Sequence, residues 1–140
     1  LFVSGSYVAT DLWTGENTSD DDRRFAEEVL HYTYDGGRAA QRGRVRVVTS
    51  HPGFSRDEYR YVNEYRPDRY RVESPDALRP AGAGAFSVMR YVENGRTAGV
   101  ASEAGGTFVM GFPFESIESD VQRDRLMRDV LDFLLKQKDR

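Results

Sequence analysis

The chain has 140 residues, with 20 basic and 23 acidic side chains and a formal net charge of −3. This length fits a single globular domain, and the slightly acidic balance argues against a nucleic-acid-binding protein, which usually carries a clear basic excess. The chain contains no cysteine, which excludes thiolate catalysis, disulfides and cysteine-ligated metals. No apolar run reaches the ~20 residues of a membrane-spanning helix.

The opening stretch is a short apolar run, Leu1-Phe2-Val3, that breaks into small residues at Ser4-Gly5-Ser6. This pattern is typical of a buried strand that runs into a tight turn at the rim of an α/β sheet. Ligands and nucleophiles of α/β folds sit at the carboxyl ends of strands. The turn after this strand is therefore the first place to expect a site.

A short helical turn is expected at Asp11-Leu12-Trp13, and a longer helix is expected to begin after Ser19. Ser19 is a good N-cap, and the carboxylates of residues 20–22 favour the positive end of the helix dipole. One apolar face is formed by Phe25, Ala26, Val29 and Leu30. Gly36-Gly37 is expected to end this helix or to follow soon after its end. Helix-start electrostatics explains the three aspartates better than a metal site does.

The middle of the chain alternates strands and loops. A short strand is predicted at Val45 to Val48, and residues 54–72 are rich in Tyr and Arg. We expect two short strands there, with Arg66-Pro67-Asp68 as the turn between them. Residues 74–84 hold two prolines and two glycines and are predicted to be a loop.

A hairpin is the clearest local pattern of the second half. Residues 86–91 alternate apolar and polar side chains, and Asn94-Gly95 predicts a type I′ turn before a partner strand at residues 99–102. A third strand, placed centrally in the sheet, is predicted at residues 107–112.

The chain ends in a predicted helix that begins after Ser119, where Ser119 and Gln122 match a capping box. Its apolar stripe consists of Met127, Val130, Leu131 and Leu134, reinforced by Leu126 and Phe133. Helices near both ends with hairpins between them predict an α/β fold with a mixed sheet flanked by helices. An all-parallel sheet would need more crossover helices than this chain offers.

One candidate chemistry is a serine hydrolase with Ser6 as nucleophile. A nucleophile elbow needs small residues two before and two after the nucleophile; Ser4 fits, whereas Val8 is β-branched. The base would be His51 or His31, oriented by Asp76 or Glu115. A Gly- and Ser-rich strand end without catalysis is the simpler interpretation, and this one is favoured.

Other chemistries have weaker signals. Two isolated histidines predict no metal site, and no phosphate-binding or dinucleotide motif is present, so no cofactor is expected. Tyr59, Arg60 and Tyr61 suit stacking on sugars, and an acidic polysaccharide would be a better ligand than nucleic acid. The alternation also fits a half-exposed strand with packed Tyr and solvated Arg. This structural interpretation is favoured over ligand binding.

The order of these elements resembles the later part of the class I glutamine amidotransferase-like fold. In that family the elbow is G-x-C-x-G and a late strand ends in F-H-P-E before a terminal helix. Here the elbow region is Ser4-Gly5-Ser6-Tyr7-Val8, so Ser6 stands where the cysteine belongs. Phe112 and Glu115 match the late motif, and Pro113 stands where the histidine would be. The family's thiolate and its base would both be missing.

The chain is more closely similar to amidotransferase-like domains of large secreted Bacteroidetes-type proteins that are labelled xanthan lyases. The similarity is carried by the run Gly111-Phe112-Pro113-Phe114-Glu115-Ser116-Ile117, followed by Arg123 and Arg125-Leu126-Met127. Residues 74–80 and Arg90-Tyr91 also match that group. The resemblance covers nearly the whole chain, and its motifs are structural rather than catalytic.

The resemblance implies a flavodoxin-like fold with a β-hairpin insertion, and residues 1–140 as a single domain, the C-terminal part of a longer domain or protein. It implies a non-catalytic module of a secreted or periplasmic, polysaccharide-related protein, with other domains of the parent chain as partners. Ser6, Tyr7 and Asp11 would line a vestigial cleft together with Glu115. A serine hydrolase or lyase that uses Ser6 with His51, and an acidic-glycan-binding module that uses the Tyr/Arg segment, are the alternatives.

Overall fold

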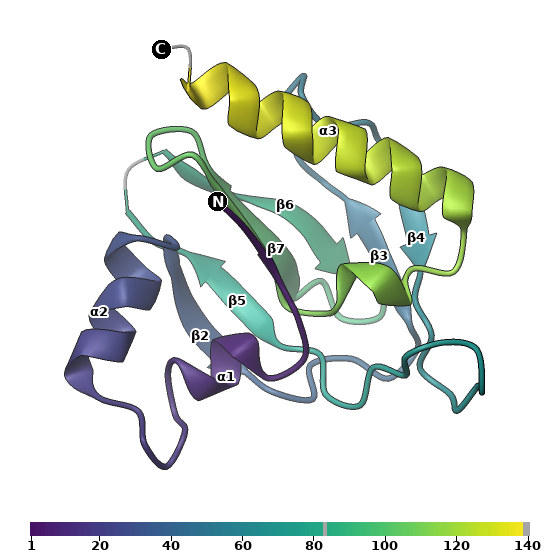
Figure 1. The fold of residues 1–140 in the computed structure, drawn as a ribbon, viewed down its shortest axis with the longest axis horizontal. Helices are drawn as coiled ribbons and strands as arrows, with labels where there is room; N and C mark the ends of the chain where they lie inside the picture. Colours follow the sequence, from purple (N-terminus) through teal and green to yellow (C-terminus); the bar gives the residue numbers. More distant parts are fainter. Residues whose placement is uncertain (83, 139–140) are drawn as a thin grey trace.

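The computed structural model describes residues 1–82 and 84–138, so Ala83 and residues 139–140 lie outside the described part (Figure 1). The elements are, in chain order, β1 (Phe2–Ser4), α1 (Val8–Asp11), α2 (Asp20–Glu28), β2 (Tyr32–Gly36), β3 (Arg44–Val47), β4 (Glu58–Arg60), β5 (Ala77–Pro80), β6 (Ala85–Tyr91), β7 (Thr97–Ser102), β8 (Thr107–Met110), the 3₁₀ turn η1 (Phe114–Ser116) and α3 (Asp120–Lys138).

The described strands form one mixed sheet, which confirms the predicted α/β architecture. Its order is β1-β8-β7-β6-β3-β4, and β5 branches from β7 to pair with β2. β1 runs parallel to β8, with Phe2 opposite Phe108 and Ser4 opposite Met110. The other pairings among the described strands are antiparallel.

Helices cover both sides of the sheet (Figure 1). Side chains alternate between the two faces of a strand, and β8 shows the result. Phe108 and Met110 pack in the cluster that includes Leu126 of α3, whereas Val109 packs in the cluster that includes Leu30 after α2. The sheet is therefore the middle layer between α3 on one face and α1 and α2 on the other.

The predicted first helix is confirmed at its start and wrong at its end. Ser19 caps α2: its side chain accepts from the Asp22 amide, and the Asp22 side chain accepts from the Ser19 amide. The two bonds together form a capping box. The helix ends at Glu28, because residues 32–36 form β2 instead of continuing toward Gly36-Gly37.

The predicted apolar face of this first helix is also only partly buried. Ala26 and Leu30 are buried, whereas Phe25 and Val29 are 42% and 43% exposed.

The pairing of β2 with β5 was not predicted, and it replaces part of the loop expected at residues 74–84. Tyr32 lies opposite Pro80 and Tyr34 opposite Leu78. Tyr and Thr favour strands, and Pro80 is tolerated because it stands at the end of its strand. The two partners are far apart in the sequence, so no local turn pattern indicates that they pair.

The hairpin of β6 and β7 is confirmed, but its predicted type I′ turn is wrong. A type I′ turn needs positive φ at both central residues, and Gly95 has it (φ 73°) whereas Asn94 does not. The Tyr91 amide donates to the Arg96 carbonyl at 2.9 Å, so the loop spans residues 92–95. The Asn94 side chain donates to the Ala39 carbonyl at 2.6 Å, which fixes the loop to the segment between β2 and β3.

The turn around Pro67 is confirmed by a bridge between Arg66 and Arg69. The first of the two strands predicted there is β4. The second predicted strand does not form and leaves only isolated contacts. In one of them the Val72 amide donates to the Val62 carbonyl at 2.8 Å.

The C-terminal helix α3 is confirmed, with two corrections. Ser119 Oγ accepts from the Gln122 amide at 3.2 Å, but the Gln122 side chain donates to the Glu58 carbonyl at 2.9 Å instead of completing the capping box. The buried positions are Leu126, Val130 and Phe133, whereas Leu131 of the predicted stripe is 49% exposed.

Candidate functional site

The turn after β1 connects the strand to α1 within three residues, and its geometry differs from a nucleophile elbow. Gly5 is required there, because a Cβ at this position would lie 2.8 Å from Val8 Cγ2. The residue with left-handed backbone is Tyr7 (φ 66°), which precedes α1. Ser6 therefore does not occupy the strained apex that an elbow gives its nucleophile. Its Oγ is buried and has no hydrogen-bond partner in the described part of the chain.

Asp76 caps the start of α1 from a distant part of the chain. Tyr7 makes no side-chain cap, so the first amides of the helix need another acceptor. The fully buried Asp76 carboxylate accepts from Thr10 Oγ1 at 2.7 Å and from the Thr10 amide at 3.4 Å, and its contacts also include the Ala9 amide. Because its negative charge lies at the positive end of the helix, the capping interaction is favourable.

Burial has a measurable consequence for this carboxyl group. Removal from water is the main cause that raises the pKa of Asp76 to about 6, and the nearby Asp11 charge acts in the same direction. The hydrogen bonds from Thr10 and Ala9 act in the opposite direction and moderate the shift. Asp76 is thus a buried acid with a raised pKa that contacts Thr10. The Thr10 hydroxyl in turn lies 3.0 Å from the Tyr34 hydroxyl.

The structure does not bring Ser6 together with His51, the base of the hydrolase alternative, because the two residues lie at opposite ends of β1. His51 Nε2 lies 2.5 Å from Glu103 in the turn before β8, and the Leu1 ammonium group donates to Gly106 in the same turn at 2.7 Å. Ser6 lies beyond the other end of the strand. The three residues of β1 lie between the two sites and alone span about 10 Å at roughly 3.3 Å per residue.

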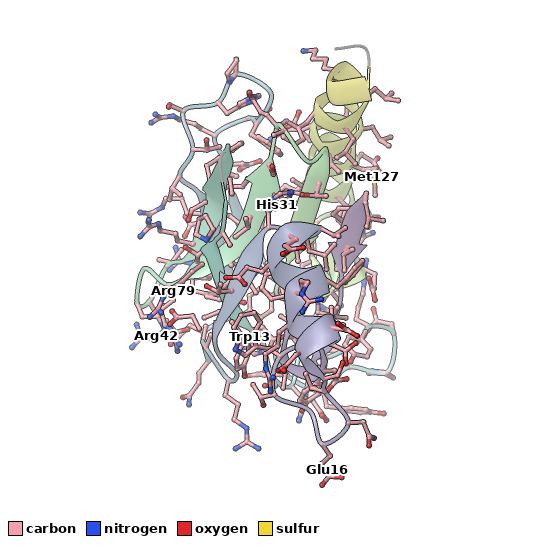
Figure 2. The ribbon with its side chains drawn as sticks, turned by 90° about the vertical axis from the view of Figure 1, so that its left-hand side faces the viewer. Trp13, Glu16, His31, Arg42, Arg79 and Met127 are labelled. Atoms are coloured by element: carbon pink, nitrogen blue, oxygen red, sulfur yellow. The ribbon has the colours of Figure 1, made fainter. Side chains whose placement is uncertain are left out.

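His31 is no better placed as a base for Ser6. It packs against the same turn from the other face of the sheet, since a Cβ on Gly105 would lie 2.3 Å from His31 Nε2. Figure 2 shows His31 at the end of α2 that lies away from Trp13 and Glu16. Both histidines are thus remote from the turn after β1.

Glu115 and Asp11, which were expected to line a cleft with Ser6, lie in different surroundings. The Phe114 amide donates to Ser4 Oγ at 3.2 Å, which ties the late motif to the end of β1, and Glu115 in η1 is exposed. Asp11 is exposed at the end of α1, where its carbonyl accepts from Thr18 Oγ1 at 2.5 Å. It lines a small cavity of about 340 Å³ with residues 15–18.

Tyr59 and Tyr61 are core residues, as the favoured interpretation of the Tyr/Arg segment expected, and the alternative role in glycan binding is corrected. Tyr59 is 0% and Tyr61 3% exposed, and Tyr61 stacks on Phe112 with ring centroids 5.0 Å apart. Burial raises the pKa of both hydroxyls well above the ordinary value. Arg60, between them, is exposed. The alternation therefore indicates a strand with one buried face, and neither tyrosine can contact a polysaccharide in the folded chain.

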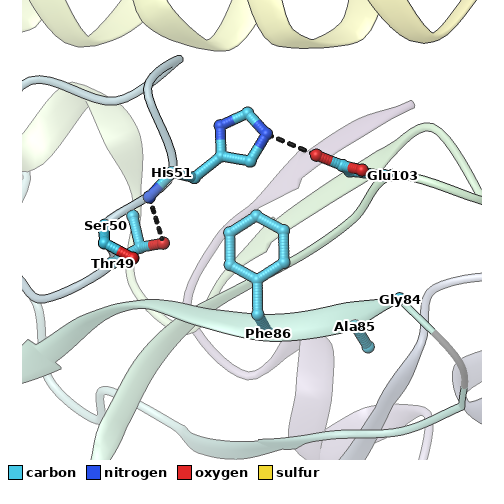
Figure 3. A pocket seen from close by; sticks show the side chains of 7 residues that line it. All are labelled: Thr49, Ser50, His51, Gly84, Ala85, Phe86 and Glu103. Carbon is cyan, nitrogen blue, oxygen red and sulfur yellow. Dashed lines mark hydrogen bonds and ion pairs between the residues drawn. The ribbon is translucent and has the colours of Figure 1, made fainter.

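A pocket of about 390 Å³ surrounds His51 at the other end of the sheet, lined by residues 49–51, residues 84–86 and Glu103 (Figure 3). The His51 ring is stacked 5.4 Å from Phe86 and lies edge-on to Phe133 at 5.3 Å. The Thr49 hydroxyl accepts from the His51 amide at 3.1 Å. This pocket was not predicted, because its acid and its aromatic ring lie far from His51 in the sequence.

Each of the two ring nitrogens of His51 has a neighbouring hydrogen-bonding group. The Gly53 amide donates to Nδ1 at 3.0 Å, so Nδ1 is the acceptor and the ring proton is on Nε2. Nε2 in turn points at the Glu103 carboxylate. Both ring nitrogens are therefore engaged by neighbouring groups.

No helix in the described part of the chain is long and apolar enough to cross a membrane. The described residues also contain no group of three or more side chains placed to hold a metal ion. Comparison of the chain with protein-family models, with curated proteins and with solved structures found no match.

Proposed function

We propose that this chain is a non-catalytic module of a larger secreted, polysaccharide-related protein, descended from a flavodoxin-like, class I amidotransferase-like domain. In this proposal the turn after β1 is a vestige of the elbow, and the module serves in structure or in binding. The proposal is carried by one observation: Asp76 occupies the amides at the start of α1, while both histidines lie at the other end of β1.

This arrangement works against acyl transfer at Ser6 in two ways. A serine nucleophile needs an adjacent base to remove its proton, and the acid nearest to α1 already accepts from Thr10. An acyl-transfer site also needs amides that stabilise a developing negative charge. The amides of Ala9 and Thr10 are bound to a carboxylate, whose charge would oppose a second anion at the same helix start.

A partner within the parent chain is supported by the position of β1. It stands at one end of the strand order, and in the described part of the chain it pairs only with β8. An edge strand presents unpaired backbone groups that another strand can use. The neighbouring helices carry exposed apolar side chains, Phe25 and Val29 near the end of α2 and Leu131 and Leu135 on α3. We expect a strand from another part of the parent protein to pair with β1.

The test is a turnover assay of wild type and of Ser6→Ala, with Ser55→Ala as the matched exposed-serine control. The substrates are nitrophenyl esters, glutamine and xanthan, the last followed by the absorbance of the unsaturated sugar that a lyase forms. We expect no turnover above background for any of the three proteins. Turnover that disappears in Ser6→Ala and persists in Ser55→Ala would overturn the proposal.

A further inference from the structure

One face of the sheet carries arginines beyond the reach of the helices. Val45 and Val47 of β3 and Tyr59 of β4 pack in the cluster that includes residues of α3, so the residues between and beside them point to the opposite face. The apolar cluster beneath α1 and α2 on that opposite face includes no residue of β3 or β4. The exposed side chains of Arg46 and Arg60 therefore stand outside the area that these two helices cover.

The strand register places four arginines of this face next to one another on three adjacent strands. We call them the arginine face: Arg44 and Arg46 of β3, Arg60 of β4 and Arg90 of β6. Arg44 is directly opposite Arg60, and Arg46 is directly opposite Arg90. Like charges at directly opposite positions of two strands destabilise a sheet. The free chain thus holds two unfavourable pairs within one small surface.

Acidic side chains offset only part of this positive charge. Glu58, which is opposite Arg46, forms an ion pair with Arg44 at 2.6 Å, and Arg90 donates to a backbone carbonyl at 3.2 Å. Within the described part of the chain, the side chains of Arg46 and Arg60 form neither a hydrogen bond nor an ion pair. Four arginines and one glutamate give this surface a charge of +3, in a chain whose formal net charge is −3.

We propose that the arginine face binds a linear polysaccharide of uronic acids through its carboxylates. A guanidinium group presents a planar fork that matches a carboxylate, and every sugar of such a polymer carries a carboxylate. A polymer that crosses β4, β3 and β6 meets a guanidinium on each strand, at the strand spacing of about 4.8 Å, which is comparable to the length of a sugar ring. A carboxylate between two arginines also relieves their mutual repulsion.

Other polyanions fit this face less well. Double-stranded nucleic acid carries one negative charge per about 1.7 Å, and its protein partners have a clear basic excess, which this chain lacks. Single-stranded nucleic acid needs exposed aromatic rings for stacking, whereas Tyr59 and Tyr91, beside these arginines in the sequence, are buried. In an extended acidic peptide, carboxylates on the same side are about 6.8 Å apart, which is wider than the strand spacing.

The experiment is an NMR titration of the ¹⁵N-labelled chain with oligogalacturonate at low salt, with its methyl ester as the matched neutral ligand. We expect the acid, but not the ester, to shift the amide signals of Arg46, Arg60 and Arg90. The affinity should fall as salt is added, because the contacts are exposed ion pairs. Poly-glutamate and single-stranded DNA are the competing polyanions and should bind more weakly.

Substitutions at the surface test the assignment to these residues. Arg46→Gln and Arg60→Gln should each weaken binding about two- to fivefold, the usual contribution of one exposed ion pair, and the double variant should weaken it roughly tenfold. Arg46→Lys keeps the charge without the fork and should recover only part of the affinity. Arg128→Gln, at an exposed position of α3, is the matched control and should bind like wild type.

The proposal is overturned if no amide of the arginine face shifts, or if the methyl ester binds as tightly as the acid. It is also overturned if poly-glutamate or DNA binds more tightly than oligogalacturonate, or if Arg128→Gln weakens binding as much as Arg46→Gln does. The inference gives a ligand class to the binding role in the proposed function and rests on that proposal. The two fail separately, because only turnover that is lost in Ser6→Ala overturns the proposed function.

Discussion

The carboxylate of Asp76 accepts a hydrogen bond from the hydroxyl of Thr10 at 2.7 Å, across 66 residues of sequence. This contact links the loop before β5 to the start of α1, beside the turn that follows β1. It explains how a four-residue helix without a side-chain cap of its own is held in place. It also puts a buried acid at the start of the helix that follows β1.

Removal of the Thr10 hydroxyl should destabilise the fold. In Thr10→Val, one oxygen of the buried Asp76 carboxylate loses its short hydrogen bond, and the expected loss in the free energy of unfolding is about 1–3 kcal/mol. Urea denaturation measures it. Thr14→Val, at an exposed position, is the control and should change stability by less than about 0.5 kcal/mol. Equal stability of the two variants would show that the Thr10 contact contributes nothing.

The pKa of Asp76 predicts a pH dependence with a definite sign. The folded pKa of about 6 lies above the ordinary 3.8, so the folded state binds the proton more tightly than the unfolded state. The stability that this group contributes is fully present below pH 3.8 and is lost as the pH rises through 6. The shift of roughly two units corresponds to a change on the order of 3 kcal/mol.

The measurement for this prediction is urea denaturation of wild type and of Asp76→Asn between pH 4 and pH 7.5. Asp76→Asn cannot ionise, so wild type should lose stability relative to the variant as the pH rises over this range. Parallel stability curves for the two proteins would mean that Asp76 has no raised pKa.

The stability of the fold should respond differently to the loss of two buried tyrosine hydroxyls. Tyr61 Oη is buried without a hydrogen-bond partner among the described residues, so Tyr61→Phe should leave stability unchanged or raise it by up to about 1 kcal/mol. Tyr91 Oη donates to the Asp76 carbonyl at 2.7 Å, so Tyr91→Phe should lower stability by about 1–2 kcal/mol. Thermal unfolding of the pair tests both, and a loss in Tyr61→Phe that matches the loss in Tyr91→Phe would contradict the account.

Gly111 should tolerate no side chain. A Cβ there would lie 2.1 Å from the Asp76 carbonyl oxygen, a backbone atom that cannot move aside easily, whereas a Cβ on Gly99 would meet the flexible Met89 side chain at 2.9 Å. Gly111→Ala should therefore cost more than about 2 kcal/mol and Gly99→Ala clearly less. Chemical denaturation ranks the two variants. The reverse order would contradict the close approach of Gly111 to the Asp76 carbonyl oxygen.

The sequence predicted the elements whose determinants are local. The Ser19 cap with its three aspartates, the β6–β7 hairpin and α3 each carry their start signals within a few residues. The pairing of β2 with β5 and the capping of α1 by Asp76 depend on residues that meet only in the folded chain. Alternation in the Tyr/Arg segment shows that a strand has two faces but not which face is buried, so glycan binding by Tyr59 and Tyr61 stayed open as an alternative until the structure placed both rings in the core.

The pocket around His51 illustrates the same limit. His51 was a candidate base because it is one of only two histidines in the chain, but its partners Glu103 and Phe86 come from β7–β8 and β6, which the topology brings to the loop after β3. The sequence pattern could not place Ser6 and His51 at opposite ends of β1. That separation follows from the parallel pairing of β1 with β8.

The most direct test of the central claim is covalent labelling with a fluorophosphonate probe, which reacts with serines that an adjacent base activates. Intact-mass spectrometry and peptide mapping of the chain, with an active serine hydrolase as positive control, report whether Ser6 reacts. We expect no label on Ser6 at any pH between 5 and 8, because both histidines lie at the other end of β1 and the Asp76 carboxylate occupies the start of α1. Stoichiometric labelling of Ser6 that is lost in Ser6→Ala would contradict it.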